Sequence, residues 1–299
     1  MSMRVKEILS IGENQLKECG IEDAAVDSKD LYCYMMGIDR SRLILEYQKV
    51  LQDAQCAEYF GLLDRRSDGE PLQYIVGTQE FMGLTFRTDP RALIPRQETE
   101  ILVERALEIL RENKVLGQPL PIAPKKNADV LDLGCGTGAI GLSIAKLAPG
   151  THVTCSDVSE EALALAKENA SKLGAGSVKW ASGSMMKPFT GRLLKRKFDM
   201  ILSNPPYIPS GVIPTLQREI REHEPMLALD GGKDGLDVYR TLIPQLPDFL
   251  KKEGVVMLEI GHDQKDQVCD MFAVNGRFIN IQGMQDLAGR DRIVMATLL

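Results

Sequence analysis

The stretch that decides the fold is DVLDLGCGTG, at residues 129–138. An apolar run typical of a buried strand leads directly into three closely spaced glycines, Gly134, Gly136 and Gly138. Glycines permit a tight turn and let the backbone approach a ligand closely, and a helix that follows such a turn presents free N–H groups. The stretch therefore predicts a strand, a ligand-binding turn and a helix in succession.

The alternation of short apolar strands with helices continues to the end of the chain. One predicted helix runs from Glu160 to Leu173, with Ser159 as its N-cap. Strands that alternate with helices form a mainly parallel sheet covered on both faces, and such sheets bind ligands at the carboxyl ends of their strands. The sequence thus predicts an α/β, Rossmann-like domain. Its seven strands are expected at 130–133, 153–156, 178–181, 200–203, 255–259, 278–281 and 293–297.

The first part of the chain has a different pattern. Apolar residues recur at helical spacing, and one helix is expected over 23–36, ended by Gly37. Two extended runs between Gln79 and Phe86 flank a glycine, which predicts a hairpin. A helix from Thr99 to about Arg111 follows, and three prolines between Gly117 and Asn127 indicate a linker. We therefore expect three parts: a small helical domain at 1–75, a hairpin with a connector helix at 76–115, and the α/β domain at 116–299.

Composition restricts the class of protein. The chain has 299 residues, of which 44% are apolar and 26% charged, as in ordinary globular proteins of about two domains. No apolar run approaches the roughly 18 residues that span a membrane, and the N-terminus lacks the features of a targeting segment, so a cytoplasmic protein without a membrane partner is expected. The six cysteines form no C-x-x-C pair and the three histidines are far apart. Neither a disulfide framework nor a metal site is expected.

The charge is unevenly distributed along the chain. Residues 1–85 carry 9 Lys and Arg against 15 Asp and Glu, whereas the remaining residues carry 27 of each kind. An acidic domain repels a phosphate backbone and gains little from counterion release. We therefore expect no direct nucleic-acid partner.

Two cofactors fit the glycine-rich turn. Gly136-x-Gly138-x-x-Gly141 satisfies the dinucleotide fingerprint, which would make the chain a dinucleotide-binding module. The glycines begin earlier, however, at Gly134 after the acidic Asp132. That arrangement suits S-adenosylmethionine, which offers an ammonium and a carboxylate instead of a pyrophosphate. At the end of the second strand, Asp157 can accept hydrogen bonds from both hydroxyls of a ribose in either case.

A second candidate site follows the fourth strand. The two prolines of Asn204-Pro205-Pro206-Tyr207 stiffen this loop. The Asn204 side-chain carbonyl and the Pro205 backbone carbonyl can each accept one N–H of a planar –NH₂ group, while Tyr207 offers a flat face. Such a grip would aim an amide nitrogen at a methyl–sulfonium carbon, and alignment is a large rate term in such transfers. No strong general base is needed, because the methylated nitrogen is acidic and sheds its proton afterwards.

These motifs, together with several others, carry a resemblance to a known family. The sequence is similar to the N5-glutamine methyltransferases of peptide chain release factors, the PrmC/HemK family. The Asn-Pro-Pro-Tyr motif alone is shared with adenine-N6 DNA methyltransferases, so an enzyme that methylates adenine-N6 or another nucleic-acid base is the alternative. The segments that carry the resemblance are 69–75, 81–84, 93–100, 132–140, 203–208, 224–225, 232–236, 258–261 and 286–292.

The resemblance implies a fold and a reaction. It implies a helical N-terminal domain that docks substrate, a hairpin connector and a seven-stranded class I methyltransferase domain. It also implies methyl transfer from S-adenosylmethionine to the glutamine of the Gly-Gly-Gln motif in class 1 release factors, with S-adenosylhomocysteine as product. Asn204, Pro205 and Tyr207 would be catalytic, and Asn204, Pro205, Pro206 and Tyr207 would bind the glutamine. The cofactor would be held by Gly134, Cys135, Gly136, Thr137, Gly138, Asp157, Met185 and Asn204.

Four charged residues outside the glycine-rich turn and the Asn-Pro-Pro-Tyr loop leave their roles open. Arg96, Glu98 and Glu100 fit either the ion pairs of a helix start or a role in closing the site. Glu259 ends a predicted strand and fits a structural hydrogen-bond partner.

Overall fold

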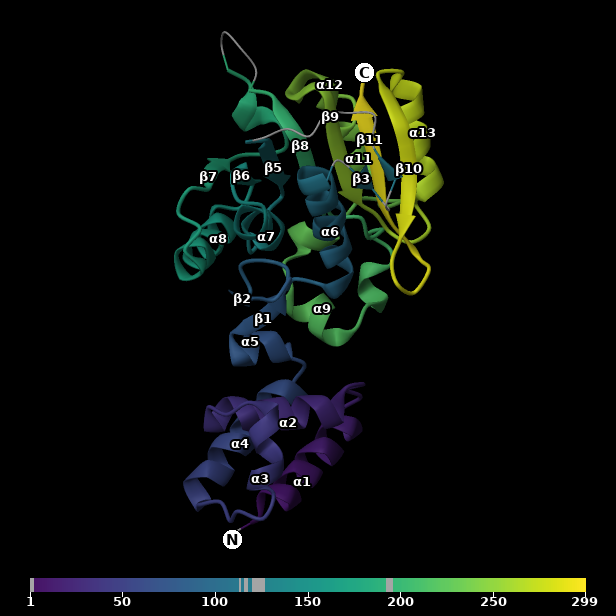
Figure 1. Cartoon of the computed structure of the whole chain (residues 1–299). Coiled ribbons are helices and arrows are strands. Elements are labelled where there is room, and N and C mark those ends of the chain that lie inside the picture. Colours follow the sequence, from purple (N-terminus) through teal and green to yellow (C-terminus); the bar gives the residue numbers. More distant parts are fainter. Residues whose placement is uncertain (1–2, 113, 116–117, 120–126, 192–195) are drawn as a thin grey trace. The chain divides into compact units, whose positions relative to one another are not determined.

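The computed structural model describes residues 3–112, 114–115, 118–119, 127–191 and 196–299, and the chain forms two compact units (Figure 1). The helical unit comprises Met1–Thr78 and Gln217–His223, and the sheet unit comprises Gln79–Leu216 and Glu224–Leu299. Most of the predicted linker at 117–127 lies outside the described residues. Because Gln217–His223 belongs to the helical unit, the chain leaves the sheet unit after residue 216 and returns to it at residue 224.

The helical unit is built on amphipathic helices, as their apolar spacing predicts. Val5, Ile8, Leu9 and Leu16 are all buried in one core with residues of the other helices. The second helix ends at Gly37, whose φ of 61° is the left-handed conformation that glycine adopts without strain. The helices of this unit are α1 (Val5–Glu18), α2 (Ala24–Met36), α3 (Arg40–Glu46), α4 (Asp53–Ser67), α5 (Leu72–Val76) and α9 (Arg218–His223).

A buried arginine explains how α9 joins this unit. Arg66 Nε lies 2.7 Å from Asp27 Oδ2, and its Nη1 lies 2.5 Å from Glu219 Oε2 of α9. The arginine side chain is only 6% exposed, so two carboxylates neutralise a cation that water scarcely reaches. The sequence alone did not indicate this pairing, because Asp27, Arg66 and Glu219 are far apart in the chain.

The predicted hairpin is present in the sheet unit. Strands β1 (Thr78–Phe81) and β2 (Leu84–Arg87) pair, and Met82 and Gly83 between them have φ of 52° and 70°. Two consecutive positive φ values are those of a type I′ turn, which matches the twist of a hairpin. Helix α6 (Gln97–Glu112) follows, and the short pair β3 (Lys114–Val115) and β4 (Gln118–Pro119) comes next.

All seven predicted strands form one sheet. Its order is β10-β11-β9-β8-β5-β6-β7, and β11 runs antiparallel to both of its neighbours while the other strands are parallel. The α/β methyltransferase-like fold predicted from the sequence is therefore confirmed. The strands are β5 (Asp129–Leu133), β6 (His152–Asp157), β7 (Lys179–Ser182), β8 (Phe198–Ser203), β9 (Leu250–Glu259), β10 (Phe278–Gln285) and β11 (Asp291–Leu298).

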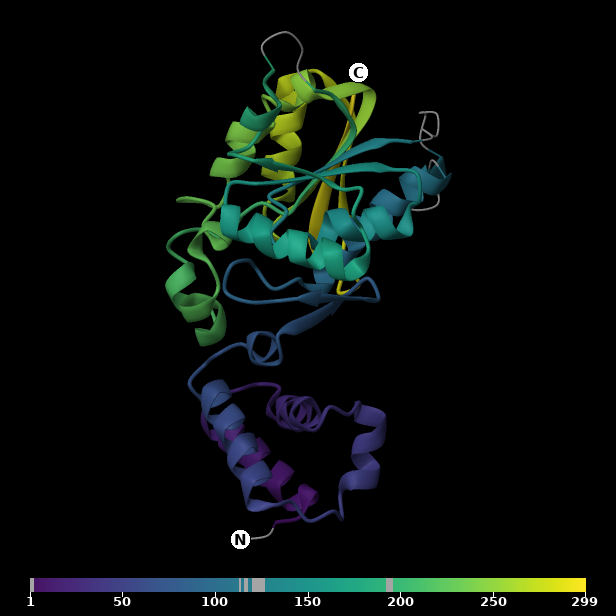
Figure 2. The same ribbon diagram turned by 90° about the vertical axis from the view of Figure 1, so that its left-hand side faces the viewer.

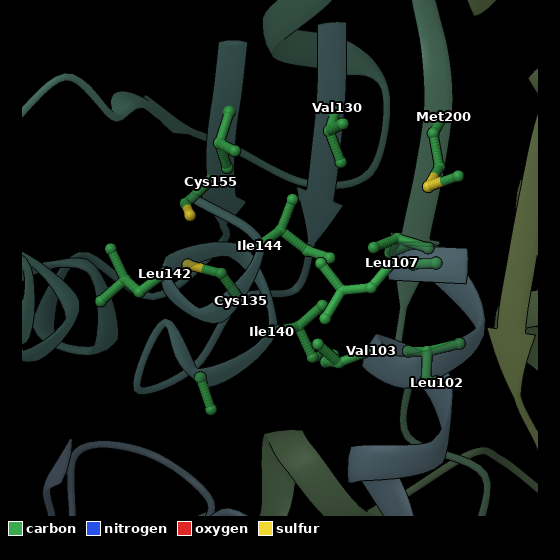
Figure 3. Close-up of a cluster of buried hydrophobic side chains, with 14 of the residues drawn as sticks. Leu102, Val103, Leu107, Val130, Cys135, Ile140, Leu142, Ile144, Cys155 and Met200 are labelled. Atoms are coloured by element: carbon green, nitrogen blue, oxygen red, sulfur yellow. The ribbon is translucent and has the colours of Figure 1, made fainter. Parts of the chain in front are cut away.

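Alternate residues of each strand face opposite layers of helices (Figure 2). Val130 packs with α6, α7 (Ala139–Leu147) and α8 (Glu160–Leu173), while Leu131 packs with the helices of the other face. Figure 3 shows the first of these cores, in which Val103 and Leu107 of α6 lie beside Ile140 and Ile144 of α7. The other helical elements of this unit are α10 (Met226–Leu229), α11 (Asp237–Leu242), α12 (Leu246–Phe249), α13 (Lys265–Asn275), η1 (Lys187–Phe189) and η2 (Ile213–Thr215).

Within the part of the chain that the structure describes, no helix combines the length and the apolar character needed to span a membrane. Likewise, the described His, Cys, Asp and Glu side chains include no cluster of three or more that could hold a metal ion.

Candidate active site

A cavity of about 660 Å³ lies within the sheet unit, where the ends of β5, β6 and β8 meet. Its volume is in the range of small-molecule sites. Two of the predicted site residues, Gly138 and Tyr207, are not among its described lining residues. The predicted residues that do line it are Gly134, Cys135, Gly136, Thr137, Asp157, Met185, Asn204, Pro205 and Pro206.

The glycine-rich turn after β5 has the conformation that its sequence predicts. Gly134, Gly136 and Gly138 have φ of 73°, 53° and 82°, which other residues rarely adopt. A Cβ on Gly134 would meet no described atom within 4 Å, so the cavity reaches this backbone directly. A Cβ on Gly138, in contrast, would lie 2.9 Å from a methyl carbon of Leu142. Gly138 thus packs the start of α7, while Gly134 opens toward a ligand.

The Asp157 carboxylate is held at the end of β6 by two backbone amides. Its Oδ2 accepts a hydrogen bond from Gly136 N at 2.9 Å, and its Oδ1 accepts one from Ser159 N at 2.9 Å. Each carboxylate oxygen has a second acceptor site. Since Asp157 also lines the cavity, one acceptor on each oxygen remains for two neighbouring hydroxyls of a ligand.

Asp132 braces this turn from inside the protein. Its side chain is fully buried, and Oδ2 accepts a hydrogen bond from Gly141 N at 2.8 Å. Burial raises the pKa of Asp132 to about 7. Asp132 is not among the described residues that line the cavity, so it ties β5 to α7 and does not contact a ligand there.

Cys135 and Cys155 lie beside Asp132, and Figure 3 shows their sulfur atoms on adjacent segments. An interaction with Cys155 and burial together raise the pKa of the Cys135 thiol well above its usual range. The interaction with Cys135 lowers the pKa of Cys155, but burial and the nearby Asp132 outweigh it and raise that pKa. Both cysteines are therefore neutral thiols at physiological pH, which excludes a thiolate nucleophile at the turn.

The loop after β8 presents Asn204 to the cavity in a defined orientation. Asn204 Nδ2 donates a hydrogen bond to Thr99 Oγ1 at 3.2 Å, and no described protein group donates to its Oδ1. The same holds for the Pro205 carbonyl oxygen among the described hydrogen bonds. Ser203 Oγ, just before them, donates to Leu133 O at 2.6 Å and anchors the loop to β5. The loop therefore leaves these two oxygens as acceptors that a ligand could use.

Tyr207 is not among the described residues that line the cavity. Its ring packs against the apolar core on one face of the sheet, and its hydroxyl lies 3.4 Å from Glu259 Oε1. The Tyr207 carbonyl accepts a hydrogen bond from Gln264 Nε2 at 2.9 Å. Burial raises the pKa of Tyr207 well above its usual value, so the phenol stays protonated and donates.

A loop of the sheet unit before α6 closes one side of the cavity. Arg96 lines the cavity and pairs with the buried carboxylate of Glu224, which also accepts from Ile94 N at 3.4 Å. Glu100 accepts a hydrogen bond from Met82 N at 2.6 Å and so holds the hairpin turn. Arg96 thus belongs to the site, whereas Glu100 has the structural role. The lining residue Thr99 was missed, because a hydroxyl in the first turn of a helix gives no signal of a partner 105 positions later.

Comparison with known proteins shows the family of the chain. Residues 7–77 match the model of the PrmC N-terminal domain, and residues 112–232 match that of the methyltransferase small domain. The chain is 41% identical to the release factor glutamine methyltransferase of Geobacter sulfurreducens, over 97% of this chain and 95% of that protein. The chain belongs to the release factor glutamine methyltransferase family. The release factor glutamine methyltransferases of Moorella thermoacetica and Bradyrhizobium diazoefficiens are 39% and 38% identical to the chain, over 98% and 94% of this chain and 98% and 91% of those proteins.

The resemblance seen in the sequence is thereby confirmed, and the chain is a methyltransferase. The reading of the glycine-rich turn as part of a non-enzymatic dinucleotide-binding module is set aside, because nearly the whole chain aligns with a family of enzymes.

Proposed function

We propose that this methyltransferase transfers the methyl group of S-adenosylmethionine to the side-chain amide nitrogen, N5, of the glutamine in the Gly-Gly-Gln motif of class 1 release factors. The names of the relatives support this substrate. The observation that carries it is the orientation of Asn204, whose amide nitrogen is used by Thr99 and whose carbonyl oxygen remains for a donor. A carboxamide –NH₂ supplies two such donors in one plane.

The residues around the turn fit the cofactor. Gly134 leaves backbone open to the cavity, and Asp157 has acceptors for the two ribose hydroxyls. Once bound, S-adenosylmethionine supplies an electrophilic methyl group on a sulfonium and leaves as S-adenosylhomocysteine. We assign its binding to the residues of the turn, to the end of β6, and to two further cavity residues. These are Gly134, Cys135, Gly136, Thr137, Asp157, Met185 and Asn204. Gly138, the N-cap of α7, supports the turn without lining the cavity.

The loop residues hold and orient the glutamine. Asn204 Oδ1 accepts one N–H and the Pro205 carbonyl accepts the other, while the rigid Pro205-Pro206 segment limits movement of the amide. An amide nitrogen is a weak nucleophile, so fixing its direction toward the methyl group is the main contribution of the protein. The proton leaves to water after transfer. In this scheme Tyr207 fixes the loop through its contact with Glu259, and its predicted packing on the amide plane stays a prediction.

Labelling tests this function directly. The protein is incubated with a class 1 release factor and S-adenosylmethionine carrying a labelled methyl group, and the product is mapped by peptide mass spectrometry. The expected result is one methyl group on the glutamine of the Gly-Gly-Gln motif, and none on a factor whose glutamine is replaced by alanine. Label on purified duplex DNA and none on the factor would instead favour the nucleic-acid base methyltransferase.

The helical unit is assigned to docking of the release factor, with residues 76–115 as the connector and 116–299 as the methyltransferase domain. The acidic balance of residues 1–85 supports a protein partner over a nucleic acid. Because release factors act in translation, we expect the enzyme to work in the cytoplasm. In the helical unit, Ile44 and Leu45 are 69% and 84% exposed and offer apolar contact surface.

A pair of variants separates docking from catalysis. Leu45→Ser should raise KM for the intact factor and leave KM for a short Gly-Gly-Gln peptide unchanged, because only the intact factor reaches the helical unit. Val274→Ser, at a site 87% exposed in the sheet unit, is the matched control and should change neither. Equal KM values for the intact factor in wild type, Leu45→Ser and Val274→Ser would show that the surface around Leu45 does not dock the release factor.

A further inference from the structure

One buried side-chain amide, that of Gln264, joins three loops of the sheet unit. Gln264 is the N-cap residue of α13 and is 5% exposed. Its Nε2 donates to Tyr207 O at 2.9 Å and to Gly235 O at 3.3 Å, and its Oε1 accepts from Gly261 N at 2.9 Å. These partners lie after β8, before α11 and after β9. Both the –NH₂ group and the oxygen of the amide are therefore paired inside the protein, as burial of an amide requires.

Two glycines before α11 let that segment pack directly on the backbone of Tyr207. A Cβ on Gly231 would lie 2.8 Å from Tyr207 Cα. A Cβ on Gly235 would clash with Tyr207 O and lie 2.5 Å from Gln264 Nε2. Gly235 also has a φ of 76°, which glycine adopts without strain. A side chain at either position would displace Tyr207, so the two glycines and Gln264 together fix where its backbone lies.

The loop that carries the candidate acceptors is held at its two ends. Before the loop, Ser203 Oγ donates to Leu133 O at 2.6 Å. At its other end, Tyr207 O accepts from Gln264. The two prolines between these ends have no N–H that could tie the middle of the loop to a neighbour, and their rings restrict backbone rotation. The direction of the Pro205 carbonyl therefore depends on where the two ends are held.

We propose that Gln264 is a positioning residue for methyl transfer, because it fixes the Tyr207 end of the loop and so keeps the Pro205 carbonyl directed at the glutamine amide. The proposal rests on the proposed function, in which that carbonyl accepts one N–H of the amide, and deepens it. Neither Gln264 nor any of its three partners is among the described residues that line the cavity. Gln264 therefore acts on the substrate only through the loop, and we expect cofactor binding at the β5 turn not to depend on it.

Two variants perturb the Tyr207 backbone in different ways in the full-length protein, with the labelled release factor as substrate. Gln264→Met keeps an unbranched side chain and removes all three hydrogen bonds. Gly231→Ala leaves Gln264 intact and adds a carbon 2.8 Å from Tyr207 Cα. Each variant should lower kcat by about 10- to 100-fold, the scale expected for a reacting group displaced by about 1 Å. The Kd for S-adenosylmethionine should stay within about threefold of wild type.

Matched controls make the same changes where they disturb little. Gln245→Met removes an exposed hydrogen bond, from Gln245 Nε2 to Thr241 O at 2.6 Å. Gly211→Ala adds a carbon that would meet nothing within 4 Å. Both controls should keep the wild-type kcat. The double variant of Gln264→Met and Gly231→Ala should lose less than the product of the two single losses, because both changes act on Tyr207. A loss equal to that product would contradict a shared route through Tyr207.

The stoichiometry of cofactor binding and KM distinguish positioning from a merely structural role. In calorimetry, both variants should bind S-adenosylmethionine at the wild-type stoichiometry. The KM for the intact factor should change by less than about threefold, because contacts away from the loop remain. A loss of kcat that only matches a loss of binding stoichiometry would show that the variants misfold, and it would overturn the proposal. A kcat of Gln264→Met within about threefold of wild type at full stoichiometry would overturn it too.

The outcomes also separate this proposal from the function on which it rests. If wild type does not methylate the glutamine of the factor, the proposed function fails. If wild type methylates it and both variants keep the wild-type kcat, only the positioning role of Gln264 fails.

Discussion

Gly141 is the position at which one added carbon should affect both the fold and the cofactor turn. It lies in α7, and its N–H donates to Asp132 Oδ2 at 2.8 Å. A methyl group at this site would lie 2.5 Å from Cys155 Sγ and 2.9 Å from Asp132 Oδ2. Both neighbours are fully buried on adjacent strands, so neither can swing into solvent.

The expected cost of Gly141→Ala follows from these distances. Non-bonded contacts settle near about 3.5–4.0 Å, so α7 must move by roughly 1 Å away from β5 and β6. Overpacking of this kind costs about 1–3 kcal/mol. The movement also weakens a buried hydrogen bond worth about 1 kcal/mol, whereas alanine gains about 1 kcal/mol over glycine in helix propensity. The free energy of unfolding of the sheet unit should therefore fall by about 1–3 kcal/mol.

The single tryptophan, Trp180 in β7, reports on this unit alone. Urea unfolding followed by Trp180 fluorescence should show a lower midpoint for Gly141→Ala than for wild type. Gly176→Ala is the control, because its Cβ would meet nothing within 4 Å, and its midpoint should stay the same or rise slightly. In addition, Cys155→Ala should partly relieve the crowding in the double variant. A midpoint for Gly141→Ala equal to wild type, or a strictly additive double variant, would refute the steric reasoning.

Three other predictions follow from the described contacts. Asn204→Ala should lower kcat by about 10²- to 10³-fold, because one of the two acceptors that align the amide is lost. The Kd for S-adenosylmethionine, measured by calorimetry, should change much less. A kcat equal to that of wild type would show that Asn204 has no part in the mechanism. Arg66→Met should destabilise the helical unit by about 3 kcal/mol, because Asp27 and Glu219 lose their cation. Hydrogen exchange in α2 and α4 should accelerate, while the unfolding transition seen by Trp180 should not move. Unchanged hydrogen exchange would contradict this role of Arg66. Asp132 binds its proton more tightly in the folded state, with a pKa of about 7, so it contributes stability below about pH 4 that is lost as the pH rises through 7. In urea titrations, Asp132→Asn should therefore lose less stability than wild type between pH 5 and pH 8. Parallel losses of stability in both proteins would exclude Asp132 as the titrating group.

Local signals predicted the elements of the fold well. The Ser159 cap is seen directly, because Ser159 accepts from Ala162 N, and the helix it starts ends at Leu173 as its pattern indicates. The turns at Gly37 and at Met82-Gly83 likewise depend on backbone conformations that nearby residues determine. Each of these features is specified by a few neighbouring residues, which is why a single sequence suffices.

Contacts between distant segments could not be predicted in this way. Thr99 and Asn204 are 105 positions apart, and Arg66 and Glu219 are further apart still. A threonine in the first turn of a helix and an asparagine in a loop are common, and so are charged residues in helices such as α4 and α9. No local pattern therefore marks these residues as partners. The motif after β8 could be identified because its four residues are contiguous. The contacts that orient it come from α6 and β9 and appear only when the sheet is assembled.

The most direct test of the central claim is a crystal structure of this protein with S-adenosylhomocysteine and a Gly-Gly-Gln peptide. We predict that the glutamine –NH₂ group donates to Asn204 Oδ1 and to the Pro205 carbonyl, with the amide nitrogen facing the sulfur of the cofactor product. A glutamine bound elsewhere, or an Asn204 whose –NH₂ group faces the peptide, would contradict the proposed recognition of the carboxamide.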